Sequence, residues 1–215
     1  KIPEMFDAAL DNKLKALWVI GEDIAQTDPN TKKVVAALKK LDLLVVQELF
    51  MTETAKLATV VLPGSSVFEK EGTFTNGERR IQRVNKVVEP IGNSKPDGQI
   101  MVEIMNKMGY PQPAFDPHGL LNEISQIVPF FKGVKRDELG INGKQWPVLE
   151  DGLGTEILHK ESFPNGKGKF AFKEFRESEE IITNSKDFPY IITTNRQLEH
   201  YNCGAMTRRT RNAVI

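Results

Sequence analysis

The chain has 215 residues, enough for one sizeable hydrophobic core or two modest domains. Its 29 basic and 29 acidic residues balance, so no net charge recruits nucleic acid or an anionic membrane, and we expect neither partner. The single cysteine excludes an internal disulfide framework and any cysteine-rich cluster within the chain, and no apolar run reaches the roughly 18 to 20 residues of a membrane span.

Three apolar runs predict the strands of a parallel sheet. Helical spacing over 3–14 predicts a helix before the first run, an amphipathic helix begins after Asp28 and ends near Leu41, and a short helix is expected over Thr52–Ala58. This alternation is the repeat of an α/β fold, in which helices flank a parallel sheet of β-α-β units. The runs are Leu17–Ile20, Leu43–Val46 and Thr59–Leu62.

The rest of the chain predicts loops, helices and short strands. Glycines and alternating residues over 63–90 predict an ordered loop that leads into a hairpin. Asp97 is placed to cap a helix over Gly98–Met108. Further expected elements are a helix over Leu120–Val128, two or three short strands within 141–175, and a buried strand over Tyr190–Thr194. The chain begins without methionine and ends in a strand-like apolar triplet, so we interpret it as a piece of a longer protein.

The end of the first strand is a candidate ligand site. Gly21 ends the apolar run, and Glu22, Asp23 and Thr27 follow where ligands of open α/β sheets are bound. The N1–H and N2–H₂ groups of guanine are adjacent donors that one carboxylate can accept together, so Asp23 is a candidate guanine reader. A turn that caps the next helix is the alternative. Neither GxGxxG nor GxxxxGK[ST] is present, so a glycine-rich phosphate cradle is not expected.

A dense group of polar donors follows the last predicted strand. Arginine there offers a planar fork for phosphate, while His200 and Tyr201 can stack or form hydrogen bonds. His118 and His159 have no second ligand at metal-binding spacing and are interpreted as surface residues.

Four segments together resemble one family. The segments are IGEDIAQTD, VVQELFMTETAKLATVVLP, EKEGTFTNGERRIQ and TTNRQLEHYNCGAMTRR. In this order and at these separations they resemble the large (alpha) subunit of molybdenum or tungsten formate dehydrogenases, among the bis-molybdopterin guanine dinucleotide oxidoreductases. The resemblance implies that 1–185 are an α/β molybdopterin-oxidoreductase domain. Residues 186–215 would then be the truncated start of the β-barrel domain that binds the pterin dinucleotide.

The resemblance also implies cofactor contacts. Gly21 would permit close approach of the guanine nucleotide, and Asp23 and Thr27 would face its base. The end of the second strand would contact the same nucleotide. Lys70 and Asp97 would contact phosphate and a base or ribose, with a surface charge and a helix cap as the alternatives. The loop after the last strand would approach the pterin and pyrophosphate. The matching positions are Gly21, Asp23, Thr27, Gln47, Glu48, Lys70, Asp97, Arg196, Gln197, His200 and Tyr201.

The parent enzyme implied by the resemblance oxidises formate to carbon dioxide, with a 4Fe-4S cluster outside this chain and an iron–sulfur electron-transfer subunit as partner. Its metal ligand, a cysteine or selenocysteine before a histidine, lies upstream, so this chain holds no catalytic or metal residue and Cys203 is interpreted as a small buried hydrophobe. The alternatives are a periplasmic-type nitrate reductase and a cofactor-free structural domain of a respiratory complex. The compartment, cytoplasmic or periplasmic, stays open.

Overall fold

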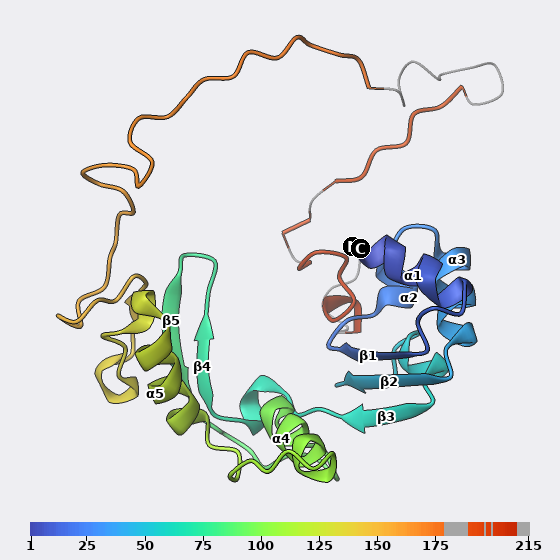
Figure 1. The fold of residues 1–215 in the computed structure, drawn as a ribbon, viewed down its shortest axis with the longest axis horizontal. Helices are drawn as coiled ribbons and strands as arrows, with labels where there is room; N and C mark the ends of the chain where they lie inside the picture. Colours follow the sequence, from blue (N-terminus) through green and yellow to red (C-terminus); the bar gives the residue numbers. More distant parts are fainter. Residues whose placement is uncertain (179–188, 196, 199, 210–215) are drawn as a thin grey trace. The chain divides into compact units, whose positions relative to one another are not determined.

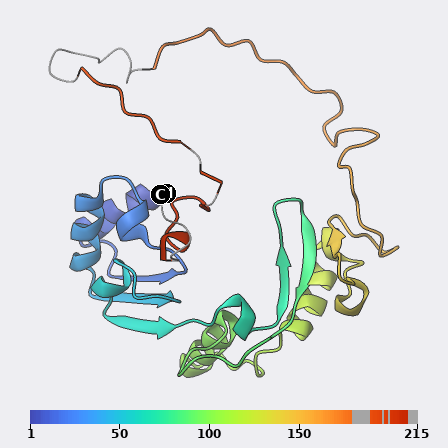
Figure 2. The same cartoon turned by 180° about the vertical axis from the view of Figure 1, so that it is seen from behind.

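The computed structural model describes residues 1–178, 189–195, 197–198 and 200–209. The chain divides into two compact units, Lys1–Leu158 and His159–Ile215, each of which is described by itself. Figures 1 and 2 trace the chain from blue to red in two opposite views.

The first unit begins with the predicted parallel sheet, which is confirmed. Its strands β1 (Ala16–Ile20), β2 (Leu43–Glu48) and β3 (Val60–Pro63) lie in the order β1-β2-β3 and run parallel (Figure 1). Ile20 is paired with Gln47, and Glu48 with Pro63. The carboxyl ends of the strands therefore meet at one edge of the sheet, where polar residues follow directly.

Helices α1 (Ile2–Leu10), α2 (Ile24–Thr27) and α3 (Thr31–Lys40) connect and cover these strands. Asn30 caps α3 by accepting a hydrogen bond from the backbone of Lys33, as the turn before the helix predicts. The apolar face of α3 packs with β2 into the first hydrophobic core, where each large side chain contributes roughly 1.5–3 kcal/mol. That face consists of Val34, Ala37 and Leu38. The helix predicted over Thr52–Ala58 is a shorter 3-10 turn, η1 (Ala55–Leu57).

A second group of elements follows the parallel sheet. The predicted hairpin is confirmed, and its second strand also pairs with a short third strand in an antiparallel sheet. Helix α5 contacts β4 and stands beside the β4–β5 hairpin (Figure 2). A second core of five buried residues includes Ile81 and Leu121. The elements are η2 (Val67–Glu69), β4 (Gly72–Thr75), β5 (Arg80–Val84), α4 (Asp97–Lys107), α5 (Pro117–Ile127), η3 (Pro129–Phe131), η4 (Arg136–Glu138) and β6 (Lys144–Gln145).

Several expectations for the later part of the chain are wrong. Within 141–175 the structure has one two-residue strand, β6, and an isolated bridge between Val148 and Gly154, rather than two or three strands. Tyr190–Thr194 does not form a buried strand, because Tyr190 and Ile192 are more than nine-tenths exposed and no strand pairs with this segment in the described part of the chain. Cys203 is exposed rather than buried. The only regular element described in the second unit is a 3-10 turn, η5 (Thr207–Arg209).

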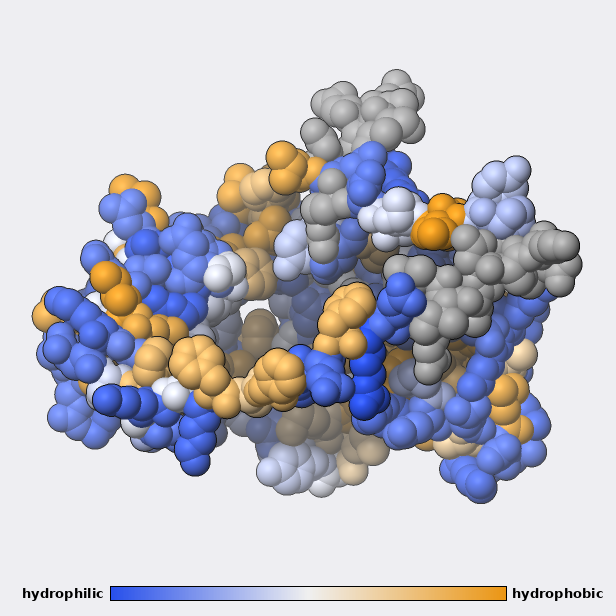
Figure 3. All heavy atoms as spheres, turned by 90° about the horizontal axis from the view of Figure 1, so that it is seen from above, coloured by the Kyte–Doolittle hydropathy of each residue, from blue (hydrophilic) through white to orange (hydrophobic). Residues whose placement is uncertain are grey.

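Large hydrophobic side chains also lie at the surface of both units. Phe170, Phe172 and Phe175 are almost fully exposed and belong to neither core. In the space-filling view of Figure 3, orange hydrophobic residues lie between blue hydrophilic ones. No helix in the described ranges is both long and apolar enough to cross a membrane.

Candidate functional site

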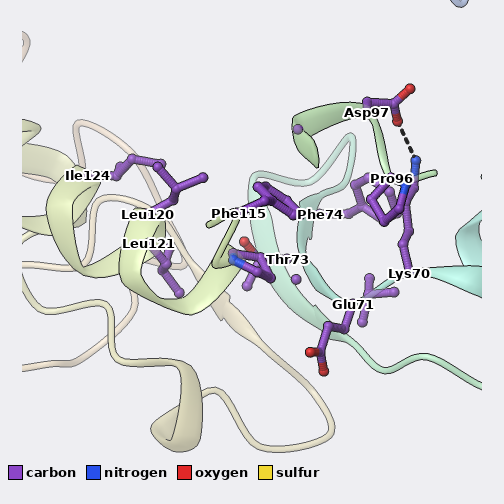
Figure 4. A pocket seen from close by; sticks show the side chains of 14 residues that line it. Lys70, Glu71, Thr73, Phe74, Pro96, Asp97, Phe115, Leu120, Leu121 and Ile124 are labelled. Carbon is purple, nitrogen blue, oxygen red and sulfur yellow. Dashed lines mark hydrogen bonds and ion pairs between the residues drawn. The ribbon is translucent and has the colours of Figure 1, made fainter. Parts of the chain in front are cut away.

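Three of the candidate residues form one hydrogen-bonded cluster at the carboxyl end of the parallel sheet. Gln47, near the end of β2, donates from Nε2 to Oδ1 of Asp97 at 2.7 Å. Lys70, which follows η2, donates from Nζ to Oδ2 of the same carboxylate at 2.7 Å. Figure 4 shows the Lys70–Asp97 contact as a dashed line. The Asp97 carboxylate is therefore shared by two residues that lie 50 and 27 positions before it in the sequence.

Two local devices bring these side chains together. The backbone of Lys95 donates to the carbonyl of Pro63 and accepts from Ser65, so the segment that begins α4 is held beside the end of β3. Glu69 accepts hydrogen bonds from the backbone of Ser66 at 2.7 Å and of Ile91 at 2.8 Å, which fixes the loop immediately before Lys70. The cluster is therefore built on anchored backbone.

Asp97 does not cap α4, so that expectation is wrong. Pro96 is the N-cap residue, no side chain caps the helix, and Asp97 is its first residue. The carboxylate is instead used by Gln47 and Lys70, which are long-range partners. Burial acts to raise the pKa of Asp97, but the hydrogen bonds from Lys70 and Gln47 and the charge of Lys70 outweigh it and hold this pKa below its usual value.

Two buried polar atoms near the cluster lack a hydrogen-bond partner among the described residues. They are Oε1 of Gln47 and Oγ of Ser65, and both side chains are about 1% exposed. A buried polar group without a partner costs about 1–3 kcal/mol, so such groups call for a ligand or another explanation. Their position at the strand ends makes this edge of the sheet the strongest candidate for a ligand contact.

Asp23 lies at the same edge, buried to 4% exposure. Its Oδ1 accepts hydrogen bonds from the backbone nitrogen of Thr54 at 2.9 Å and from the Thr54 hydroxyl at 2.7 Å. Oδ2 has a longer contact of 3.4 Å with the backbone nitrogen of Glu53. The carboxylate thus ties the turn after β1 to the turn after β2.

The other candidates at this edge are more exposed. Gly21 adopts a φ of +62°, which favours glycine, and a Cβ there would point into open space. Thr27 donates from its hydroxyl to Glu22 at 2.9 Å. The Glu48 carboxylate accepts from the backbone of Leu49 at 2.7 Å. These contacts order the turns without filling the space in front of Gly21.

An open cavity of about 230 Å³ begins at the Lys70–Asp97 pair (Figure 4). The rings of Phe74 and Phe115 line it, and Leu120 of α5 lies farther along the same wall. The Phe115 ring packs onto the first turn of α4 because residue 98 is glycine; a Cβ there would lie 2.2 Å from Phe115 Cε2. The cavity is apolar apart from its charged rim.

The remaining candidates belong to the second unit. His200 Nδ1 lies 2.6 Å from the Thr207 hydroxyl, whereas Gln197 and Tyr201 are exposed. Gln197 and His200 line an open polar cavity of about 800 Å³. Arg196 lies outside the described residues.

Sequence reasoning missed Thr54 and Ser65. The available signal for Thr54 was the TxT sequence over 52–54, in the turn after the second strand, where a hydroxyl can accept and donate at once. The described residues contain no group of three or more His, Cys, Asp or Glu side chains that could hold a metal. His118 lies 3.7 Å from Glu71 and is partly exposed.

Known proteins resemble this chain in sequence and in fold. The molybdopterin oxidoreductase family model matches residues 1–107. The chain is 45% identical to the F420-dependent formate dehydrogenase subunit alpha of Methanocaldococcus jannaschii, over 99% of this chain and 32% of that protein. It is 43% identical to the F420-dependent formate dehydrogenase 2 subunit alpha of Methanococcus maripaludis, over 96% of this chain and 31% of that protein.

A solved structure agrees with these relatives. Acetylene hydratase from Pelobacter acetylenicus superposes with a TM-score of 0.54 at 27% identity, over 66% of this chain and 20% of that one. The chain spans about a third of the length of the two curated relatives. The resemblance noted in the sequence is confirmed: the chain belongs to the molybdopterin oxidoreductase family.

Proposed function

We propose that this chain is part of a formate dehydrogenase alpha subunit and holds one side of its pterin guanine dinucleotide cofactor. The parent enzyme would oxidise formate to carbon dioxide, with an iron–sulfur subunit as electron-transfer partner and a 4Fe-4S cluster outside this chain. The names of the two curated relatives support the substrate, and the match over residues 1–107 supports the cofactor class.

The observation that carries the proposal is the Gln47–Asp97–Lys70 cluster at the strand ends. It offers an ammonium group for a phosphate, a carboxylate for a base or ribose, and a buried carbonyl oxygen, Oε1 of Gln47, that has no partner in the described residues. A guanylated pterin presents the matching groups, namely phosphate oxygens, hydroxyls and amine donors. The ammonium, carboxylate and carbonyl groups of the cluster therefore fit the cofactor.

The other candidates complete the proposed binding region. Asp23 and Thr27 would face guanine, Gly21 would leave room for it, and Glu48 would contact the same nucleotide. The loop of the second unit would approach the pterin and pyrophosphate through Arg196, Gln197, His200 and Tyr201. When bound, the molybdenum or tungsten and its pterins supply the redox chemistry, and this chain supplies grip and orientation. We further propose that 1–185 are the α/β domain and 186–215 the start of the next one.

The test uses the full-length protein with Gln47→Leu, which keeps the side chain's size and removes its amide. We expect the purified variant to hold several-fold less metal and less acid-releasable GMP, because both the Asp97 contact and the buried acceptor are lost. Gln99→Leu is the matched control, since Gln99 donates to a different carboxylate, Glu103 within α4, at 2.9 Å. Equal GMP content in the two variants would contradict the proposal.

Activity assays separate the alternatives. Loaded enzyme should reduce an artificial electron acceptor with formate. Turnover of nitrate without turnover of formate would instead indicate a periplasmic-type nitrate reductase. Purified full-length protein without pterin from a pterin-producing host would indicate a cofactor-free structural domain.

A further inference from the structure

We propose that Thr54 is a positioning residue that leaves Asp23 one ligand-facing oxygen, Oδ2. The inference rests on the proposed function, in which Asp23 contacts guanine, and it sharpens that role. A carboxylate with two free oxygens could accept both adjacent donors of guanine, whereas Asp23 would accept only one. The second donor of the base then needs an acceptor elsewhere in the protein.

Oδ1 of Asp23 is fully occupied by hydrogen bonds from Thr54. Two donors of Thr54, its backbone nitrogen at 2.9 Å and its hydroxyl at 2.7 Å, both end on this oxygen. A carboxylate oxygen has two lone-pair positions, so Oδ1 has no capacity left for a ligand. Thr54 is fully buried, so water does not compete for these bonds.

The direction of the Thr54 hydroxyl proton is also fixed. Thr54 Oγ1 accepts a hydrogen bond from the backbone nitrogen of Ala25 at 3.0 Å. Because the Ala25 N–H donates to this oxygen, the single hydroxyl proton is donated to the other partner, Asp23 Oδ1. Ala25, Thr54 and Asp23 form a chain of hydrogen bonds with one polarity, which fixes the rotation of the carboxylate.

Oδ2 of Asp23, in contrast, has only one weak contact among the described residues. Its one contact among the described residues is the backbone nitrogen of Glu53 at 3.4 Å, longer than an ordinary N–H···O bond. Oδ2 therefore keeps acceptor capacity, and the turn that carries Asp23 begins at Gly21, where a Cβ would meet only open space. Without the Thr54 hydroxyl the carboxylate could rotate, and Oδ2 would lose its fixed direction.

The experiment compares full-length holoenzymes by the rate at which GMP-containing cofactor is lost in mild urea. Thr54→Val removes the hydroxyl and keeps the shape, and we expect roughly threefold to tenfold faster loss. Thr54→Ser restores the hydroxyl and should behave as the wild type. Thr59→Val is the matched control, because it removes a threonine oxygen that accepts from the Leu44 backbone at 3.0 Å, at the other end of the sheet.

Thermal unfolding of the cofactor-free proteins measures any purely structural effect. Faster GMP loss in Thr54→Val than in Thr59→Val, at similar thermal stability, supports the inference, and equal loss overturns it. Thr54→Ala takes the place of Thr54→Val if that variant does not fold. Asp23→Asn tests the proposed function separately. If this variant retains GMP as the wild type does, guanine contact by Asp23 is refuted. If Asp23→Asn loses GMP faster while Thr54→Val retains it normally, only the role of Thr54 is refuted.

Discussion

The Lys70–Asp97 ion pair should stabilise the start of α4 by about 1 kcal/mol. The two charged atoms are 2.7 Å apart, and the side chains are 21% and 38% exposed. Fully exposed pairs contribute about 0.2–1 kcal/mol, and loss of one partner from a fully buried pair costs about 3–5 kcal/mol. Because solvent screens a carboxylate that is more than a third exposed, we place the cost of Lys70→Met at about 1–2 kcal/mol and the coupling within the pair near 1 kcal/mol.

A double-mutant cycle with Lys70→Met and Asp97→Asn measures this coupling. Hydrogen exchange of the α4 amides in the cofactor-free full-length protein is the assay, and a coupling of about 1 kcal/mol corresponds to roughly a fivefold change in exchange rate. The Lys132–Glu150 pair, whose side chains are 57% and 74% exposed, is the control and should give a coupling near zero. Additive effects at Lys70 and Asp97, within about 0.3 kcal/mol, would refute the reasoning.

Two further predictions concern acid stability and packing. The pKa of Asp97 is lowered in the folded protein, so the stabilising effect of its carboxylate is complete above the ordinary value of 3.8 and is lost as the pH falls through the lowered value. The difference in unfolding free energy between wild type and Lys70→Met should therefore close in acid. A constant difference would contradict this. Gly133→Ala would place a Cβ 1.7 Å from the Leu149 carbonyl oxygen, so we expect it to destabilise the local structure by roughly 2–4 kcal/mol, as measured by hydrogen exchange. Gly77→Ala is the control and should have almost no effect, because its Cβ would meet nothing within 4 Å.

The parallel sheet could be predicted from the sequence because its strands are continuous apolar runs with clear ends. Gly21 takes a positive φ directly after β1, and Asn30 caps α3 through its own side chain. These signals act within a few residues. They also place Asp23, Gln47 and Glu48 at one edge, because parallel strands end together.

The remaining features could not be predicted, because they depend on contacts with residues far away in the sequence. Asp97 has the residue type of a helix cap, but it is the first residue of α4, and Gln47 and Lys70 donate to its carboxylate instead. The apolar run at Tyr190–Thr194 has the composition of a strand, yet it finds no strand to pair with in the described ranges. Thr54 became a candidate only when its two donors were seen to meet Asp23.

The unpartnered atoms at the strand ends lead to a last prediction, which concerns where the cofactor stabilises the protein. Gln47 Oε1 and Ser65 Oγ are buried without a partner in the described part of the chain, and each such group costs about 1–3 kcal/mol. A ligand that satisfies them binds the folded state alone and stabilises it where it binds.

Hydrogen exchange in the loaded full-length enzyme should therefore slow most over 47–54 and 63–66, relative to the cofactor-free protein. Helix α3, whose residues 31–40 include neither of these atoms, is the internal control and should change little. Uniform slowing across both regions would mean that the cofactor stabilises the subunit as a whole. Slowing in α3 alone would mean that the strand ends are not where it is held, because a bound group protects first the amides whose local opening would release it.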